Sequence, residues 1–406
     1  MLRNDMSPRA KVLLTFRVLT YRIVTRFCGY WQTCDTLTHG MDEETKRYVG
    51  FSLFPGIGPV RFKLLLKYFG SAKDAWKAPL ATLKQIKLGD KLSDEFDHFR
   101  KTKDIDLYIS DLGKLHVSVL TIASPKYPRL LREISDAPFL LYVKGKKNGP
   151  INMDRTVAVV GTRKITPYGK EITRRLVSEL VAYGFTVVSG LAYGVDAVAH
   201  QAAMDAGGKT IAVLGCGIDI IAPPCNANLY NAIATGGGAI VSEMPLGMRP
   251  SKGLFPARNR IISGLSLGVV VTEGADDSGA LITARNAGEQ GREVFAVPGP
   301  ITSHYSRGPA KLLKNGAKLV ESVDDIIEEL GITKQIGSHN SRRLPDFTGL
   351  TREEQKLATI LKDQPVHIDE LVRRSGLTTQ VVGATLTVLE MKGIVKDIGD
   401  NVYGLV

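Results

Sequence analysis

The sequence is poor in cysteine and lacks long apolar runs, and each shortage excludes a class of protein. Its four cysteines form no C-x-x-C pair and match no zinc-ligand spacing, so we expect a reduced cytoplasmic protein without a disulfide framework. The nearest candidate for a membrane span, 11–31, is interrupted by Arg17, Arg22 and Arg26. A membrane helix needs about 18 or more consecutive apolar residues, so the sequence excludes one.

Motifs of catalysis and of nucleotide binding are missing as well. The chain contains no G-x-G-x-x-G, no G-x-x-x-x-G-K-[ST] and no G-x-S-x-G. Asp196 and His200 lie four residues apart on a predicted helix, and we interpret His200 as a helix histidine with satisfied hydrogen bonds. Asp276 and Asp277 are residues of the type that binds Mg²⁺, but a helix cap at Ser278 is the favoured interpretation. The sequence therefore gives no positive reason to assign an enzyme activity, a metal or a cofactor.

Glycine and positive charge, by contrast, are abundant. The chain has 41 glycines in 406 residues, without a repeat, which indicates many tight turns. Its 53 Lys and Arg against 41 Asp and Glu leave a net charge of +12, which favours a polyanionic partner. The length predicts two or three domains.

Residues 1–40 differ in composition from the rest of the chain. They carry six basic and two acidic residues without a clear core pattern. We interpret them as a disordered basic extension, or as upstream sequence read from a wrong start, with Met41 as the natural start. The alternative is an amphipathic transit peptide or a helix on a membrane surface.

Residues 42–115 predict a small helical domain of the SAM or helix-hairpin-helix type. Gly56 and Gly58 form a glycine turn between two helices, and such a turn leaves backbone N–H groups facing outward at the start of the second helix. A helix N-terminus of this kind suits a phosphate. The alternative is that the two glycines only shape the turn.

Within the predicted domain 116–330, residues 156–330 alternate short runs rich in Val and Ile, almost free of charge, with helical stretches. This pattern predicts an α/β domain with an extended Rossmann-like, doubly wound and mostly parallel sheet, whose ligands bind at the carboxyl ends of the strands. The predicted strands are 157–160, 186–188, 210–214, 239–241, 268–271 and 294–297. The predicted helices are 168–183, 195–206, 257–265 and 278–290.

A polar linker, 331–345, precedes an end domain, 346–406. Three predicted helices and a hairpin in this domain indicate a winged helix. Residues 351–406 carry seven basic and eight acidic residues, so the domain lacks the basic surface typical of DNA binding. We favour protein contact or regulation for it, with DNA binding as the alternative.

Candidate site residues follow the predicted strands. Gly161, Thr162 and Arg163 combine a glycine turn, a hydroxyl and a guanidinium at a helix N-terminus, which is chemistry for a phosphate. Phe255 lies among cations and offers a ring for base stacking, although a core position is the alternative. The predicted nucleic-acid site comprises Gly161, Thr162, Arg163, Ser189, Gly190, Lys252, Phe255, Arg258, Asn259, Arg260, Ser278 and Gly279.

The order of the motifs resembles the DNA-processing protein A family (DprA, also called Smf), from about residue 48 to 330. The motifs are V-A-V-V-G-T-R (157–163), V-V-S-G-L-A-Y-G-V-D-A-V-A-H (187–200), I-A-V-L-G-C-G-I-D (211–219), F-P-A-R-N-R-I-I-S-G-L-S (255–266), S-G-A-L-I-T-A-R (278–285) and G-R-E-V-F-A-V-P-G (291–299). The end domain resembles the winged helix of many members.

The resemblance implies a single-stranded-DNA-binding protein that protects incoming strands and loads a RecA-type recombinase onto them in natural transformation and recombination. It also implies a homodimer in a family not known as enzymes. Tyr193 replaces a common arginine, so we expect somewhat weaker DNA binding than is usual. The family's DNA-binding positions fall here on Arg163, Lys252, Phe255, Arg258, Asn259 and Arg260.

Two other functions compete with this one. The first is a nucleotide N-glycosidase of a related Rossmann-like group, but the stretch 273–279 lacks the paired glycines of the P-G-G-x-G-T-x-x-E motif. The second is a transcription regulator that senses a nucleotide and uses the winged helix. The acidic end domain argues against this function.

Overall fold

The computed structural model describes residues 41–86, 88–145, 155–332, 350–361, 366–399 and 401–405. The chain divides into two compact units, one within residues 1–334 and one within residues 335–406. The expectations for residues 1–40 and for most of the 331–345 linker lie outside the described residues.

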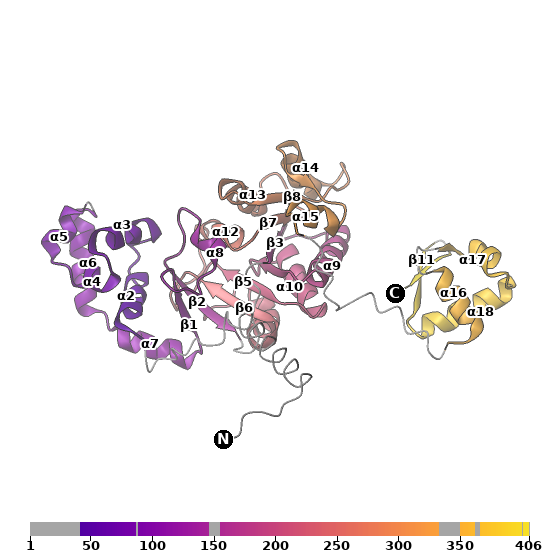
Figure 1. Ribbon diagram of the computed structural model, residues 1–406, viewed down its shortest axis with the longest axis horizontal. Coiled ribbons are helices and arrows are strands. Elements are labelled where there is room, and N and C mark those ends of the chain that lie inside the picture. Colours follow the sequence, from indigo (N-terminus) through magenta and orange to yellow (C-terminus); the bar gives the residue numbers. More distant parts are fainter. Residues whose placement is uncertain are drawn as a thin grey trace, which may run out of the picture. The chain divides into compact units, whose positions relative to one another are not determined.

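A nine-stranded sheet forms the centre of the first unit (Figure 1). In spatial order the strands are β1 (Ser118–Thr121), β2 (Leu140–Gly145), β6 (Gly238–Ser242), β5 (Thr210–Leu214), β4 (Thr186–Ser189), β3 (Thr156–Val160), β7 (Gly268–Val271), β8 (Glu293–Ala296) and β9 (Lys318–Leu319). In this order the last seven strands, from β6 to β9, are parallel to one another, whereas β1 and β2 pair antiparallel at one edge. This arrangement confirms a doubly wound, mostly parallel sheet.

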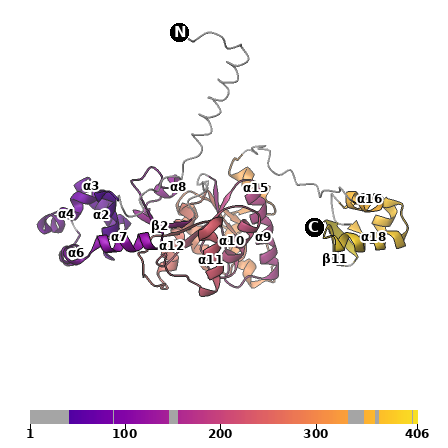
Figure 2. The same cartoon turned by 90° about the horizontal axis from the view of Figure 1, so that it is seen from below.

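Two layers of helices cover the sheet because its strands are apolar on both faces. Along β3, Val157 and Val159 pack with α9 and α10, whereas Ala158 and Val160 pack with α12 and α13. Figure 2 shows α9, α10 and α11 side by side in the first of these layers. The helices of this domain are α8 (Arg129–Arg132), α9 (Pro167–Ala182), α10 (Val195–Asp205), α11 (Ala227–Ala232), α12 (Leu254–Gly264), α13 (Gly279–Glu289), α14 (Arg307–Lys314) and α15 (Val323–Glu329).

The strand order reverses between β3 and β7. From β3 the chain proceeds through β4 and β5 to β6 in one direction, and from β7 through β8 to β9 in the other. In open α/β sheets the ligand crevice lies outside the carboxyl ends of the strands at such a reversal. The loops after β3 and β7 are therefore the place for a site.

The helical part before the sheet has an aromatic core. Phe51 packs against Phe62, Trp76 and Phe96, and Phe62 stacks on Phe139 just before β2 with ring centroids 4.0 Å apart. The helices are α2 (Glu43–Ser52), α3 (Pro59–Phe69), α4 (Ala72–Lys77), α5 (Leu80–Gln85), α6 (Asp90–Thr102) and α7 (Ile105–Lys114).

The glycine turn between α2 and α3 has the predicted form. Gly58 is the extended N-cap of α3, and the guanidinium of Arg61 donates to the carbonyl of Gly56 at 2.7 Å. A Cβ on Gly56 would lie 2.3 Å from Leu92 and 2.8 Å from Phe54, so a larger residue there would displace these side chains. Phosphate binding at this turn stays a prediction.

The second unit is a winged helix, as predicted. Its α16 (Arg352–Ile360), α17 (Ile368–Ser375) and α18 (Thr379–Met391) surround a small core, and β10 (Val366–His367), β12 (Val402–Leu405) and β11 (Val395–Gly399) form a three-stranded sheet. The last helix, α18, contains no Lys or Arg, and Val381, Val388 and Met391 on it are exposed.

Candidate nucleic-acid interface

A cavity of about 610 Å³ lies where the strand order reverses. The turn after β3, the start of α12 and the loop from β7 into α13 contribute to its wall. The structure thus brings together most of the residues that the sequence singled out. Nine of those twelve residues line the cavity, namely Gly161, Thr162, Arg163, Lys252, Phe255, Arg258, Asn259, Ser278 and Gly279.

Phe255 lies in the first turn of α12, which begins at Leu254 rather than at Ala257 as predicted. The helix includes Pro256, because a proline is tolerated in the first turn of a helix, where its missing N–H would be unpaired anyway. The ring of Phe255 is half-buried in the cavity wall. The exposed guanidinium of Arg163 lies over it, with Cζ 5.5 Å from the ring centroid.

The helix N-termini differ in what they offer an anion. At α9, Thr166 donates through its N–H and its hydroxyl to the carboxylate of Glu273, at 3.0 and 2.6 Å. That carboxylate covers the start of the helix, because a Cβ on Gly169 would lie 2.0 Å from it. The carboxylate of Glu273 thus already accepts the hydrogen bonds of Thr166 at this helix start. Phosphate binding by the turn of Gly161, Thr162 and Arg163 stays a prediction.

Two other helix N-termini open into the cavity instead. No side chain of the described residues caps α12 at Gly253. At α13 the hydroxyl of Ser278 accepts from the N–H of Ala280 at 3.3 Å, and Gly279 follows without a side chain. Because the N-terminal end of a helix carries partial positive charge, both helices make the cavity attractive to anions.

The turn that carries Arg163 is tightly held. The N–H of Thr162 donates to the carbonyl of Glu273 at 2.7 Å, and the N–H of Val195 donates to the carbonyl of Thr162 at 3.1 Å. Gly194 has a φ of 75°, and a Cβ there would lie 2.2 Å from the carbonyl oxygen of Thr162. Glycine is thus required at Gly194, and the rigid turn leaves Arg163 in a defined place beside the cavity.

Three predicted site residues lie outside the lining of the cavity. The hydroxyl of Ser189 is buried and donates to the carbonyl of Val159 at 2.8 Å. The guanidinium of Arg260 forms ion pairs with Glu243 at 2.5 Å and with Asp136 at 3.2 Å. The third is Gly190, whose carbonyl accepts from the guanidinium of Arg258. All three hold loops and helices in place at the edge of the site.

Arg258 and Asn259 line the cavity, but their polar groups bind within the protein. Arg258 is only 5% exposed, and its guanidinium donates to the carbonyls of Gly190, at 2.7 Å, and of Val213. The amide of Asn259 donates to the carbonyl of Gly279 at 3.2 Å. Each of these side chains therefore joins α12 to a neighbouring element.

Five charged or aromatic residues of the lining were not among the predicted site residues. They are Lys164, Asp196, Asp277, His304 and Tyr305. Lys164 follows Arg163 directly and Asp277 precedes Ser278, so both were within reach of the motif argument. His304 and Tyr305 belong to a short 3-10 helix (His304–Ser306) after β8, and only the sheet order places that strand next to β7.

The Asp196 and His200 pair is structural. Buried His200 pairs with the hydroxyl of Thr210 through Nδ1 at 2.6 Å, and burial lowers its pKa to about 3. Its buried Nε2 has no hydrogen-bond partner among the described residues, so the expectation of satisfied hydrogen bonds is correct for Nδ1 only. Burial raises the pKa of Asp196, whose carboxylate accepts from the N–H of Gly190 at 3.1 Å. Among the described residues, no group of His, Cys, Asp and Glu is arranged to hold a metal ion.

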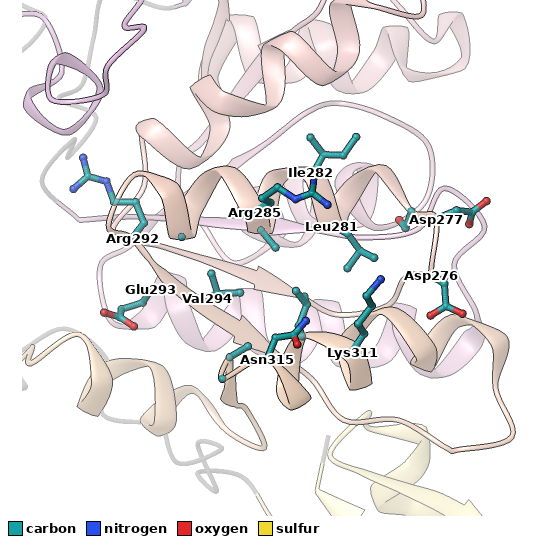
Figure 3. Close-up of a pocket in the computed structure, with 16 residues that line it drawn as sticks. Asp276, Asp277, Leu281, Ile282, Arg285, Arg292, Glu293, Val294, Lys311 and Asn315 are labelled. Carbon is teal, nitrogen blue, oxygen red and sulfur yellow. The ribbon is translucent and has the colours of Figure 1, made fainter.

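A second cavity, of about 590 Å³, lies between α13 and α14 (Figure 3). Its charges are mixed, since Asp276, Asp277 and Glu293 line it together with Arg285 and Lys311. Its remaining cation, Arg292, already pairs with Glu133 at 3.2 Å. The first cavity, with its cations, helix N-termini and aromatic ring, is the better match to a nucleic acid.

The fold and this cavity define a Rossmann-like protein with a cationic, aromatic cavity at the reversal of its strand order and a winged helix at its end. The family model of DNA recombination-mediator protein A matches residues 118–331, and that of the DprA winged helix domain matches residues 345–401. The chain belongs to the DNA recombination-mediator protein A family, whose members are called DprA or Smf.

Relatives of known name agree with this assignment. Protein Smf of Synechocystis is 34% identical over 386 residues, which is 87% of this chain and 97% of the relative. DNA processing protein DprA of Bacillus subtilis is 44% identical over 214 residues, which is 53% of this chain and 71% of the relative. The protein accordingly has a DNA-processing role of the DprA type.

A solved structure agrees as well. The X-ray structure of DNA processing protein A from Streptococcus pneumoniae is 34% identical, and the match covers 71% of this chain and 99% of that chain with a TM-score of 0.62. Within the ranges that the structure describes, none of the helices has the length and apolar character needed to cross a membrane.

Proposed function

We propose that the protein binds single-stranded DNA in the cavity between β3, α12 and α13. The observation that carries this proposal is the pairing of Arg163 with Phe255, which places an exposed cation beside an aromatic ring that faces the cavity. Arg163 and Lys252 then bind phosphates, and a base stacks on Phe255. Single strands fit this arrangement because their bases are free to stack on a side chain.

The proposal extends to delivery of the strand. The protein protects the bound single strand and loads a RecA-type recombinase onto it in natural transformation and recombination, and it works as a homodimer. Family membership supports this role. We expect faster recombinase assembly on a strand coated with single-strand-binding protein when the protein is added, and unchanged assembly would contradict the loading role. Analytical ultracentrifugation tests the dimer.

The winged helix has a separate part in this proposal. Because α18 lacks Lys and Arg and exposes apolar side chains, it fits a protein partner better than a DNA groove. We expect the full chain and a chain that ends at residue 345 to bind single-stranded DNA equally. Loss of binding in the shorter chain would assign DNA contact to the end domain.

A salt series tests the DNA site directly. We expect fluorescence anisotropy of a labelled dT oligonucleotide to show binding by the full-length protein and weaker binding by the double variant Arg163→Ala, Lys252→Ala. Loss of two phosphate contacts reduces the slope of log affinity against log salt by about 1.4 for a single strand. The matched control, Arg174→Ala with Arg175→Ala, removes the same charge from the exposed side of α9. Coincident curves for both double variants would overturn the proposed site.

A further inference from the structure

Arg258 is a buried cation that binds the ends of two sheet strands. Its guanidinium donates to the carbonyl of Gly190, which follows β4, and to the carbonyl of Val213 in β5. A Cβ on Gly190 would lie 2.3 Å from Nη1 of Arg258, so the close approach depends on glycine. With 5% of its surface exposed, Arg258 has little contact with solvent.

The position of Arg258 on α12 gives these bonds a consequence for the site. Phe255 lies three residues earlier on the same helix and therefore about one turn away on the same side. The residue after Arg258, Asn259, donates through its side-chain amide to the carbonyl of Gly279 at the start of α13. The turn of α12 that carries Phe255 is thus joined to β4 and β5 by one side chain and to α13 by the next.

A direct contact between Arg258 and a phosphate conflicts with this arrangement. The guanidinium would have to leave two carbonyls that it now satisfies, and unpaired buried polar groups are costly. It would also leave the neighbourhood of the buried carboxylate of Asp196, whose charge it offsets. Arg163 and Lys252, by contrast, are exposed and reach solvent beside the same cavity.

We propose that Arg258 is a positioning residue that holds Phe255 in place for base stacking and does not contact the phosphate chain. This inference rests on the proposed binding of single-stranded DNA. Both hydrogen bonds to the strand ends are donated by Nη1 of the guanidinium. A lysine keeps the charge, but its side chain ends one bond short of Nη1, so it does not replace the arginine here.

Two readouts separate positioning from direct contact. Anisotropy across a salt series gives the affinity and the number of phosphates bound, and the fluorescence of 2-aminopurine in the oligonucleotide reports base stacking. For Arg258→Lys in the full-length protein we expect a loss of affinity of about 3- to 10-fold, smaller than that of Phe255→Ala, since only part of one base stack is lost. We also expect weaker quenching of 2-aminopurine and an unchanged salt slope.

A double-mutant comparison with Phe255→Ala completes the test. If Arg258 acts through Phe255, then adding Arg258→Lys to Phe255→Ala lowers the affinity little further. Should Arg258→Lys fail to fold, Gly190→Ala takes its place, because the new Cβ displaces the guanidinium and leaves Arg258 in the chain. The same losses are expected for it.

The possible outcomes are distinct. A fall of the salt slope by about 0.7, with effects additive to those of Phe255→Ala, would show a phosphate contact and overturn the inference. Wild-type affinity and quenching in Arg258→Lys or Gly190→Ala would overturn it while leaving the proposed function intact. Absence of single-strand binding by the wild-type protein would overturn both.

Discussion

The guanidinium of Arg163 lies over the ring of Phe255, with Cζ 5.5 Å from the ring centroid. The two residues come from different elements, the turn after β3 and the first turn of α12, and meet only in the folded chain. A cation over a ring face is attracted to it, so each side chain helps to hold the other in place. In the proposed site the pair therefore offers, at one point of the cavity, a charge for a phosphate and an aromatic surface for a base.

Replacing Phe255 by alanine is expected to weaken binding of single-stranded DNA by about 5- to 150-fold, because stacking contributes about 1–3 kcal/mol per base. The salt slope should stay the same, since no cation is lost. The conservative variant Phe255→Tyr keeps the ring and should retain most of the affinity. Anisotropy titrations measure both variants. Equal affinities of Phe255→Ala and wild type would place the stacked base elsewhere.

Removing the negative charge of Asp277 is expected to strengthen DNA binding. Its carboxylate lines the cationic cavity and opposes a phosphate there. For Asp277→Asn we expect a roughly 2- to 5-fold gain at low salt, in line with about 1 kcal/mol for charges 4 Å apart in water, and a smaller gain at high salt.

The neighbouring Asp276 offers a matched control for this variant. Asp276 lines the second cavity but is not part of the lining of the first. Asp276→Asn makes the same change of net charge one residue away, so it should alter the affinity less. If the two variants gain equally, then overall charge and not the cavity determines the effect.

Substitution of Gly194 by alanine is expected to disturb the turn of Thr162 and Arg163. The new Cβ would lie 2.2 Å from the carbonyl oxygen of Thr162, at a φ of 75°. Strain at such a position costs about 1–3 kcal/mol, so both the melting temperature and the DNA affinity should fall. Gly288→Ala in α13 is the control, because a Cβ there meets open space and a helical alanine stabilises by about 0.5–1 kcal/mol.

Buried His200 is expected to make the protein less stable as the pH falls below neutrality. Its pKa is about 3 in the folded chain, whereas an unfolded histidine titrates near 6.5. Between these two values the unfolded chain binds a proton that the folded chain does not, so stability falls with decreasing pH by up to about 1.4 kcal/mol per pH unit. Above pH 6.5 the contribution is fully present.

Thermal unfolding followed by circular dichroism between pH 8 and pH 5 measures this effect. His200→Gln removes the titrating group, so its melting temperature should change less over this range than that of the wild type, whatever its absolute stability. Parallel curves for the two proteins would show that another group controls the dependence on pH.

Some features of the protein follow from the sequence by itself. Short runs of Val and Ile that are free of charge and alternate with helical stretches are typical of strands buried on both faces, and this pattern predicted the parallel strands from β3 to β8 within one or two residues. The glycine turns at strand ends and the family motifs identified the region of the site, because glycine spacing and charge are local properties. The winged helix could be predicted as well, because its three helices and its hairpin are also local patterns.

Only the tertiary structure decided which candidates share the cavity. Ser189 and Arg260 look like site residues in the sequence, but their partners, Val159 and Glu243, occupy other strands or loops and draw them into the protein. His304 joins the cavity because β8 lies beside β7. Glu273 takes the N-terminus of α9 because β7 lies beside β3. Pairings between distant segments depend on sheet order and side-chain packing, which local sequence patterns do not encode.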